Sequence, residues 1–408
     1  MLLSGLADVG RLKTLAGSSG HHSTYSVYSM CCDDHLNPQP QNSRSIEAVV
    51  AQKRPLNYIY TVGFDINAGI NLLRSDMRAG IEFGKALTVM IKIGGFGYAC
   101  ILGLVLISNC SFFSPNWPFG LFASFSPFLI VMFPFVIGAL LMVWRKAIPL
   151  VTLFAFGAFY PFFTFDKMVK PSVEDCNIID CVTVVAANLR HNENALERLA
   201  MTQAKDADIL IITEFPYGGT SEQLLALFPM GGDAQVGLVT DPNLQLGSRL
   251  AVISRKPLGA IKLQIESFAT PKIRHRGIVT FDYAIAKGNT VSFAVVHPPP
   301  PKGPEETRAR DVYLKAASQT LDTKTNFVMI GDFNLTPWEP GFESLPGKRA
   351  GDPRWSRTWN ARNFVERLTI DHALIGDGID LAETSVLEDV GSDHFPIHLV
   401  IHTKADTD

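Results

Sequence analysis

The stretch Phe327-Val328-Met329-Ile330-Gly331-Asp332-Phe333-Asn334-Leu335-Thr336-Pro337 decides how the rest of the chain is interpreted. Its first four residues are apolar and predict a buried strand. Gly331 allows the backbone to turn, and an extended backbone places the side chains of Asp332 and Asn334 on the same side. A carboxylate and an amide at a strand end suit a hard cation or an attacking water. An Asx turn that closes the strand is the alternative interpretation.

Charge is unevenly distributed along the 408 residues. Residues 1–170 contain 13 Lys and Arg against 8 Asp and Glu, a balance of +5, whereas residues 171–408 contain 23 against 31, a balance of −8. Non-specific DNA binding usually requires a basic face. Nucleic acid is therefore a less favoured partner, and no protein partner is predicted.

The middle of the N-terminal half is strongly apolar. No Asp, Glu, Lys or Arg occurs in the 52 residues Ile93–Trp144, more than twice the ~20 residues that one spanning helix needs. A polar loop divides this run, and a second charge-free run follows Arg145-Lys146. We predict a membrane region at residues 83–166, with helices at about 87–108, 120–144 and 147–165. Residues 1–82 lack periodicity and are expected to have low order.

Lys and Arg residues next to membrane helices indicate which helix ends face the cytoplasm. Arg74, Arg78 and Lys85 precede the first helix, and Arg145-Lys146 lie between the second and the third. We therefore expect both flanks in the cytoplasm and everything after the third helix on the opposite side, in contact with the lipid bilayer only through the helices. Cys176 and Cys181 could oxidise there, but their spacing leaves a disulfide open.

After a linker at 167–177, residues 178–404 have the pattern of a soluble α/β (α+β) domain, with a tail at 405–408. Strands outnumber helices, and polar residues recur where strands end. This pattern predicts stacked sheets with helices outside and one site at the rim. Predicted strands are 182–187, 209–213, 249–254, 278–286, 290–296, 327–330, 370–375 and 397–402, with helices at 193–203 and 308–318.

Six fragments carry polar groups at these strand ends. Each has a structural explanation when taken alone; Asn188, for example, could cap the following helix. Together they supply oxygen ligands for a metal and carboxylate–imidazole pairs for proton transfer. These are the groups that a phosphoryl transition state needs. The fragments are Asn188, Glu214, His297, Asp332 with Asn334, Asp371-His372 and Asp393-His394.

The order of these fragments resembles the endonuclease/exonuclease/phosphatase superfamily, over about residues 180–403. Gly-Asp-Phe-Asn-x-Thr-Pro and Ser-Asp-His-x-Pro are its specific motifs, and membrane-anchored bacterial members are most similar. The resemblance implies a four-layered α/β/β/α sandwich, here preceded by a bundle of about three transmembrane helices. It places the chain in the bacterial inner or plasma membrane, with the catalytic domain periplasmic or extracellular. One departure is Thr213-Glu214, because the superfamily usually has Gln-Glu there.

The resemblance also implies a metal site. Asn188 and Glu214 would hold a divalent ion, Mg²⁺ or alternatively Mn²⁺. Asp332 or Asp393 would share it.

Proton transfer would involve the remaining residues. Asp332 or His394 would activate a water, and Asn334 would orient that water or a phosphate oxygen. His297, supported by Asp371, would stabilise the phosphate or protonate the leaving group.

We therefore predict a membrane-anchored, metal-dependent hydrolase of a phosphodiester or phosphomonoester, which could be lipid-linked, acting outside the cytoplasm. An extracytoplasmic nuclease and a non-catalytic binding domain of the same fold are the alternatives. Arg274-His275-Arg276 could contact a phosphate or form a solvated turn. Nearby tryptophans could line a pocket, contact the membrane or pack internally: Trp338, Trp355 and Trp359.

Overall fold

The computed structural model describes residues 66–108, 117–172, 181–228, 234–239, 249–266, 276–285, 289–354, 356–363 and 367–404. The low order predicted for residues 1–65 lies outside the described residues. So do Cys176, Trp355 and the tail 405–408. Cys181 is disulfide-bonded, and its pairing with Cys176, left open by the sequence, is not tested by the described residues.

Three helical segments in the described residues are long and apolar enough to cross a membrane. They agree with the predicted positions except at the start of the first helix, α1, which begins at Ile66. Residues 66–82 contain no proline and many good helix formers, so the helix continues through them. The predicted low-order segment 1–82 was therefore too long, because residues 66–82 belong to α1. The segments are Arg74–Ile107, Gly120–Val143 and Arg145–Thr164.

Helical elements before residue 165 follow closely on one another. They are α1 (Ile66–Ser108), α2 (Phe119–Phe122), η1 (Ala123–Phe125), α3 (Ser126–Val143), η2 (Arg145–Ala147) and α4 (Ile148–Thr164).

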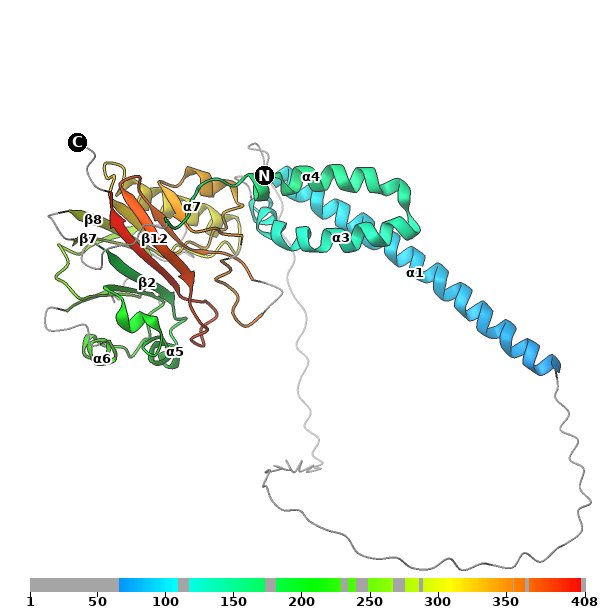
Figure 1. The fold of residues 1–408 in the computed structure, drawn as a ribbon, viewed down its shortest axis with the longest axis horizontal. Coiled ribbons are helices and arrows are strands. Elements are labelled where there is room, and N and C mark those ends of the chain that lie inside the picture. Colours follow the sequence, from blue (N-terminus) through cyan, green and yellow to red (C-terminus); the bar gives the residue numbers. More distant parts are fainter. Residues whose placement is uncertain are drawn as a thin grey trace, which may run out of the picture. The chain divides into compact units, whose positions relative to one another are not determined.

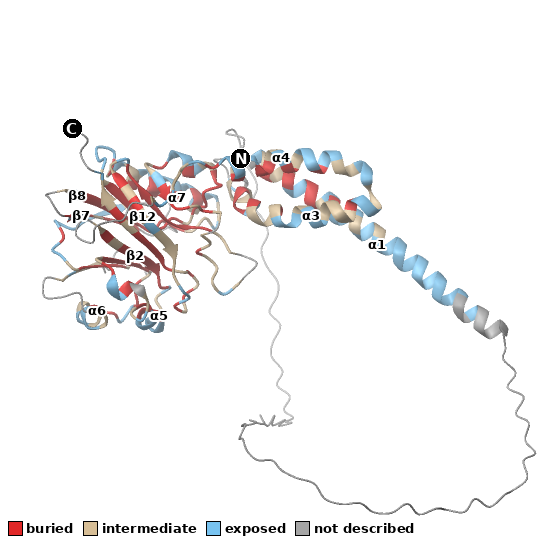
Figure 2. Cartoon of the chain, viewed as in Figure 1, coloured by how far each residue is buried: buried red, intermediate tan, exposed pale blue. Residues whose placement is uncertain are grey.

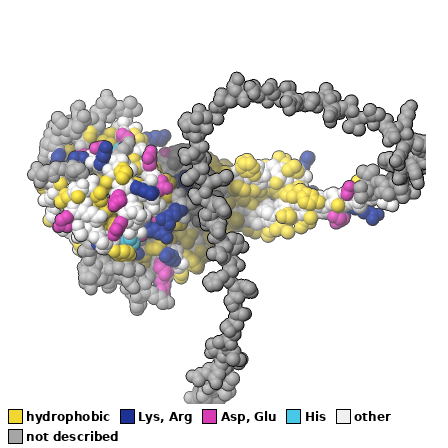
Figure 3. Space-filling model, turned by 90° about the horizontal axis from the view of Figure 1, so that it is seen from below, with side chains coloured by type: hydrophobic (Ala, Val, Ile, Leu, Met, Phe, Trp, Pro, Cys, Tyr) yellow, Lys and Arg dark blue, Asp and Glu magenta, His cyan; other side chains and the backbone are white. Residues whose placement is uncertain are grey.

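Outward-facing side chains of these helices remain apolar. Phe83, Phe135 and Phe156 are 71%, 69% and 73% exposed. Figure 3 shows hydrophobic side chains gathered over this part of the chain. Large exposed apolar surfaces in proteins mark contact with a membrane or a partner.

Two mixed sheets form the rest of the chain (Figure 1). The seven-stranded sheet has the order β1 (Met168–Val169), β10 (Lys348–Ala350), β11 (Asp371–Ile375), β9 (Phe327–Asp332), β8 (Thr290–Val296), β7 (Arg276–Ala284), β6 (Lys262–Glu266). The six-stranded sheet has the order β12 (Ile379–Val386), β13 (Ile397–Thr403), β2 (Val182–Asn188), β3 (Ile209–Thr213), β5 (Leu250–Ser254), β4 (Gln235–Val239).

The sheets pack face to face, and helices cover their outer faces (Figure 2). Strand β9 illustrates the pattern, since Val328 and Ile330 join the core between the sheets while Met329 faces α7 (Pro304–Gln319). Helices α5 (Glu193–Leu199) and α6 (Ser221–Leu227) cover the second sheet. The predicted four-layered α/β/β/α sandwich is confirmed.

The predicted linker at 167–177 is partly incorporated into the first sheet. Only three residues separate α4 from β1, which pairs in parallel with β10. Lys167 also donates hydrogen bonds from Nζ to the carbonyls of Phe342, Glu343 and Leu345. The sheet sandwich thus begins before residue 178, the predicted boundary.

Candidate active site

Strand topology brings the predicted polar residues to one edge of the sandwich. The parallel strands β2 and β3 end there, as do the parallel strands β8 and β9. Their antiparallel neighbours β13 and β11 begin there. The residues collected at this edge are Asn188, Glu214, His297, Asp332, Asp371 and His394.

Gly331 lets β8 and β9 approach each other just before the site. Its φ is +139°, and a Cβ at this position would overlap the carbonyl oxygen of Val296. Val296 pairs with Gly331 in the sheet and directly precedes His297. Glycine here thus fixes the spacing of His297 and Asp332.

We expect Gly331→Ala to lower the free energy of unfolding by about 1–3 kcal/mol, since overpacking must push the two strands apart. Thermal unfolding of the detergent-solubilised chain measures this. Gly80→Ala is the control, because Gly80 lies in α1 with nothing within 4 Å of the added Cβ and alanine favours a helix. Equal thermal unfolding midpoints for Gly331→Ala and Gly80→Ala would contradict the steric argument.

Asp332 lies at the centre of the site and is 2% exposed. Its Oδ1 accepts a hydrogen bond from the backbone N–H of Asn334 at 2.8 Å. Its Oδ2 accepts from Nδ2 of Asn188 at 3.1 Å. The same oxygen lies 3.7 Å from Nε2 of His297 and 3.8 Å from Nε2 of His394. One carboxylate oxygen thus faces nitrogen atoms from both sheets.

Glu214 is the second carboxylate at this edge. Its Oε1 lies 3.3 Å from Nε2 of His297 and 3.4 Å from Nδ2 of Asn188. Its Oε2 lies 3.7 Å from Nε2 of His191. Glu214 adopts φ +48°, a backbone conformation that non-glycine residues rarely adopt and that is frequent at functional sites.

His394 and Asp371 form a buried carboxylate–imidazole pair, with 2.9 Å between Nδ1 and Oδ2. The prediction that Asp371 supports His297 is therefore wrong. Asp371 is paired in register with Asp332, and β9 separates β11 from β8, which leads into His297. Asp371 consequently meets His394, while His297 faces Glu214 on the other side of Asp332.

Asp393 and Asn334 lie at the site in different ways. Asp393 forms an ion pair with Arg190 (Oδ2 to Nη1, 3.2 Å). The side chain of Asn334 donates from Nδ2 to the carbonyl of Pro298 at 3.1 Å, which holds it over the site.

His372 faces away from this edge. It is fully buried, its Nδ1 accepts from Nε of Arg349 at 2.9 Å, and its ring contacts Phe342 edge-on. Burial and the charge of Arg349 lower its pKa well below the usual value. His372 is therefore a neutral packing residue.

Ionisation differs sharply among the site residues. Burial alone would raise the pKa of Glu214, but the hydrogen bond and charge of His297 lower it to about 2. Burial alone would lower the pKa of His394, but the charges of Asp371 and Asp332 raise it to about 9. Burial raises the pKa of Asp332. Perturbed groups of this kind cluster at functional sites.

A cavity of about 550 Å³ opens over these residues. Arg276 and Trp359, from segments flagged in the sequence, both line it. Trp338 instead packs on Phe162, with 4.7 Å between ring centroids.

Arg190 and His191 of the site were missed by the sequence analysis. Both follow Asn188 closely in the sequence, and both adopt a positive φ in the structure. The cavity-lining residues that precede α3 were missed as well: Leu121, Ser124 and Phe125.

The donors fit a divalent cation. Oxygens of Glu214 and Asp332 approach the same Nδ2 of Asn188, and carboxylate oxygens are the ligands that Mg²⁺ prefers. Asn188 itself uses Oδ1 to accept from the backbone of Arg190 at 3.0 Å, so its amide must rotate to offer an oxygen ligand.

A second group capable of holding a cation shares Asp332. The donor atoms of Asp332, Asp371 and His394 lie within 4.8 Å of one another. Because Asp371 and His394 already satisfy each other, this group would have to give up that hydrogen bond to bind an ion.

Comparison with known proteins agrees with this geometry. Residues 185–394 match the model of the Endonuclease/Exonuclease/phosphatase family. Comparison with curated proteins gives no match.

Solved structures of low sequence identity are similar over about half of the chain. An endonuclease/exonuclease/phosphatase from Beutenbergia cavernae has 16% identity and a TM-score of 0.46, covering 55% of this chain and 72% of its own. Truncated TDP2 of Caenorhabditis elegans has 15% identity and a TM-score of 0.42, covering 55% and 98%. The endonuclease domain of TRAS1, a telomere-specific non-LTR retrotransposon, has 18% identity and a TM-score of 0.38, covering 55% and 100%.

The matched segment contains every residue of the candidate site. It also spans more than half of the sequence, from the strand that carries Asn188 to His394. The chain belongs to the endonuclease/exonuclease/phosphatase family.

Proposed function

We propose that this protein is a divalent-metal-dependent phosphoesterase, anchored in a membrane by its apolar helices and acting outside the cytoplasm on a phosphodiester or phosphomonoester. The observation that carries the proposal is the crowding of nitrogen atoms from Asn188, His297 and His394 around Oδ2 of Asp332. Such a site can hold a phosphate, a water and a cation together. Members of this family are generally hydrolases of phosphate esters.

Metal binding falls to Glu214 and Asp332, with Asn188 and Asp393 as further oxygen donors. A bound Mg²⁺ or Mn²⁺ polarises a phosphoryl oxygen and neutralises charge in the transition state. The low pKa of Glu214 keeps its carboxylate ionised for this purpose.

Asp332 accepts the proton of the attacking water. Its buried carboxylate, faced by His297 and His394, is placed to receive that proton. The water oxygen bonds to phosphorus as the bond to the leaving oxygen breaks. Asn334, held over the site by Pro298, orients the water or a phosphate oxygen.

The two histidines stabilise charge on opposite sides of Asp332. His394, cationic at neutral pH because of Asp371, donates from Nε2 to a phosphate oxygen. His297 lies beside Glu214 and donates a proton to the leaving oxygen. The proton that Asp332 took from the water then passes to His297, whose Nε2 lies 3.7 Å from Oδ2 of Asp332, and both groups are restored. Positioned donors of this kind supply most of the catalysis in phosphoryl transfer.

Membrane anchoring rests on the helical segments Arg74–Ile107, Gly120–Val143 and Arg145–Thr164. Lys and Arg residues flank the start of the first helical segment and separate the second segment from the third. From this distribution of positive charge we infer that these helix ends lie in the cytoplasm. Passage through three helices delivers the sheet sandwich to the periplasmic or extracellular side.

Hydrolysis of aryl phosphate monoesters and diesters by the detergent-solubilised full chain tests the proposal. We expect turnover with Mg²⁺ or Mn²⁺, loss with EDTA, and recovery when metal is restored. Unchanged turnover in EDTA would contradict the metal site. A folded chain that binds neither metal and hydrolyses neither ester would overturn the enzyme assignment.

Plasmid DNA and RNA included in the same assay test the nuclease alternative. Arg190 and Arg276 at the site could contact a nucleic-acid phosphate. Cleavage with steeply salt-dependent binding would favour a nuclease.

A further inference from the structure

The wall of the catalytic cavity opposite the sheets is formed by the segment at the start of the second apolar helix. Leu121, Ser124 and Phe125 line the same cavity as Glu214 and Asp332. We propose that this segment is part of the substrate-binding surface, and that the substrate is a phosphate ester carrying a long apolar chain that resides in the bilayer. This inference rests on the proposed phosphoesterase function and adds the class of substrate.

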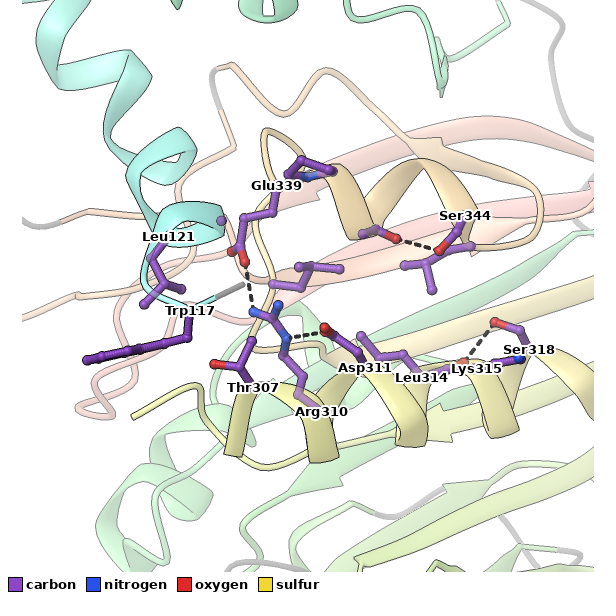
Figure 4. A pocket seen from close by; sticks show the side chains of 15 residues that line it. Trp117, Leu121, Thr307, Arg310, Asp311, Leu314, Lys315, Ser318, Glu339 and Ser344 are labelled. Carbon is purple, nitrogen blue, oxygen red and sulfur yellow. Dashed lines mark hydrogen bonds and ion pairs between the residues drawn. The ribbon is translucent and has the colours of Figure 1, made fainter. Parts of the chain in front are cut away.

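A polar contact fixes the segment against the catalytic loop. Ser124, 4% exposed, lies 2.8 Å from Thr336 (Oγ to Oγ1) and donates to Oε1 of Glu339 at 3.1 Å. Glu339 in turn is paired with Arg310 of α7 at 2.8 Å (Figure 4). Thr336 is four residues after Asp332, so the helix start is joined directly to the loop that carries the proposed base.

Aromatic packing provides a second contact. Phe162 and Phe165, at the end of α4, lie 4.7 Å and 5.6 Å from Trp338 between ring centroids. Phe165 also contacts Phe342 at 6.0 Å. These residues belong to the same buried cluster as Ala123 and the α7 side chains. Both the polar and the aromatic contacts therefore hold the catalytic loop against the ends of the apolar helices.

The cavity is lined by both polar and apolar groups. Glu214, Asp332 and His394 contribute polar groups, whereas Leu121 and Phe125 of the helical segment, together with Leu368 and Ile370, contribute apolar ones. Phe125 is 48% exposed, and both helical residues lie at the beginning of the apolar span Gly120–Val143.

This arrangement matches an amphiphile rather than a water-soluble phosphate. An alkyl or isoprenyl chain lying along the span would reach Leu121 and Phe125 as it leaves the bilayer, with its phosphate at Asp332. A nucleotide offers no chain to contact this wall. A neighbouring cavity of about 620 Å³, between Trp117 and α7, shares Leu121 and Glu339 with this one and is not needed for this path.

The inference is tested by comparing an ethyl and a hexadecyl ester as substrates in the same detergent. Both esters belong to the class, monoester or diester, that the chain hydrolyses. We expect kcat/KM to be at least about tenfold higher for the hexadecyl ester, because each buried methylene contributes about a fourfold factor when fully desolvated. Phe125→Ser and Leu121→Gln should each reduce this hexadecyl-to-ethyl ratio several-fold, and Phe125→Leu should preserve it.

Phe135→Ser is the matched control, since Phe135 lies in the same apolar span, is 69% exposed and is not among the residues that line the cavity. The hexadecyl-to-ethyl ratio of kcat/KM for Phe135→Ser should equal that of the unmodified chain. Equal kcat/KM for the two esters, or an equal fall in Phe125→Ser and Phe135→Ser, would overturn the inference while leaving the phosphoesterase intact. Absence of hydrolysis of both esters would instead refute the proposed function on which it rests.

Discussion

Asp332→Asn should lower kcat by about 10²–10⁴-fold, the usual contribution of general acid–base catalysis. Asparagine has nearly the same shape, but it cannot accept a proton from water. It also removes a negative charge that faces His297 and His394. Metal-dependent turnover of the aryl ester, measured at saturating substrate, gives the effect.

Asp322→Asn is the control, because Asp322 is an exposed residue in the turn after α7 and should leave kcat unchanged. Thermal unfolding should show that both variants are folded. Retention of full turnover by Asp332→Asn would remove Asp332 from the proposed role as the base.

Arg310→Met should lower the free energy of unfolding by about 3–5 kcal/mol, the typical cost of removing one partner of a buried ion pair. Arg310 and Glu339 are both 4% exposed in their side chains and 2.8 Å apart. Without Arg310, Glu339 remains as a buried carboxylate, held only by neutral donors from Thr336 and Ser124. A fall in the thermal midpoint of about 10 °C is expected.

Lys404→Met is the matched control for a broken ion pair. Lys404 and Asp380 are 3.8 Å apart and 50% and 35% exposed, so its loss should cost less than about 1 kcal/mol. The double variant Arg310→Met/Glu339→Met should recover part of the stability, because no buried charge is left unpaired. Equal midpoints for Arg310→Met and Lys404→Met would show that the buried pair contributes little.

The sequence predicted the fold and most members of the site because local signals were strong there. The apolar strand before Gly331, and similar strands before Glu214 and His297, placed polar groups at strand ends. Their gathering at one edge follows from strand direction alone. The apolar helices were equally clear from the absence of charge.

Pairing within the site could not be predicted in the same way. Whether Asp371 meets His297 or His394 depends on which strand lies between β8 and β11, and no local pattern encodes strand order. The contact of Ser124 with Thr336 joins residues more than two hundred positions apart. A serine in an otherwise apolar run carries no distinguishing sequence signal.

The short connection between α4 and β1 joins the sheet sandwich tightly to the helices that precede it. Strand β1 forms the edge of the seven-stranded sheet and covers β10, and Phe162 and Phe165 cover Trp338. A soluble fragment starting at residue 171 would carry an open sheet edge and an uncovered tryptophan, which are features that promote self-association. Removing the helices would therefore alter the sheet sandwich as well, because the two parts share the contacts of Lys167, Phe162 and Phe165.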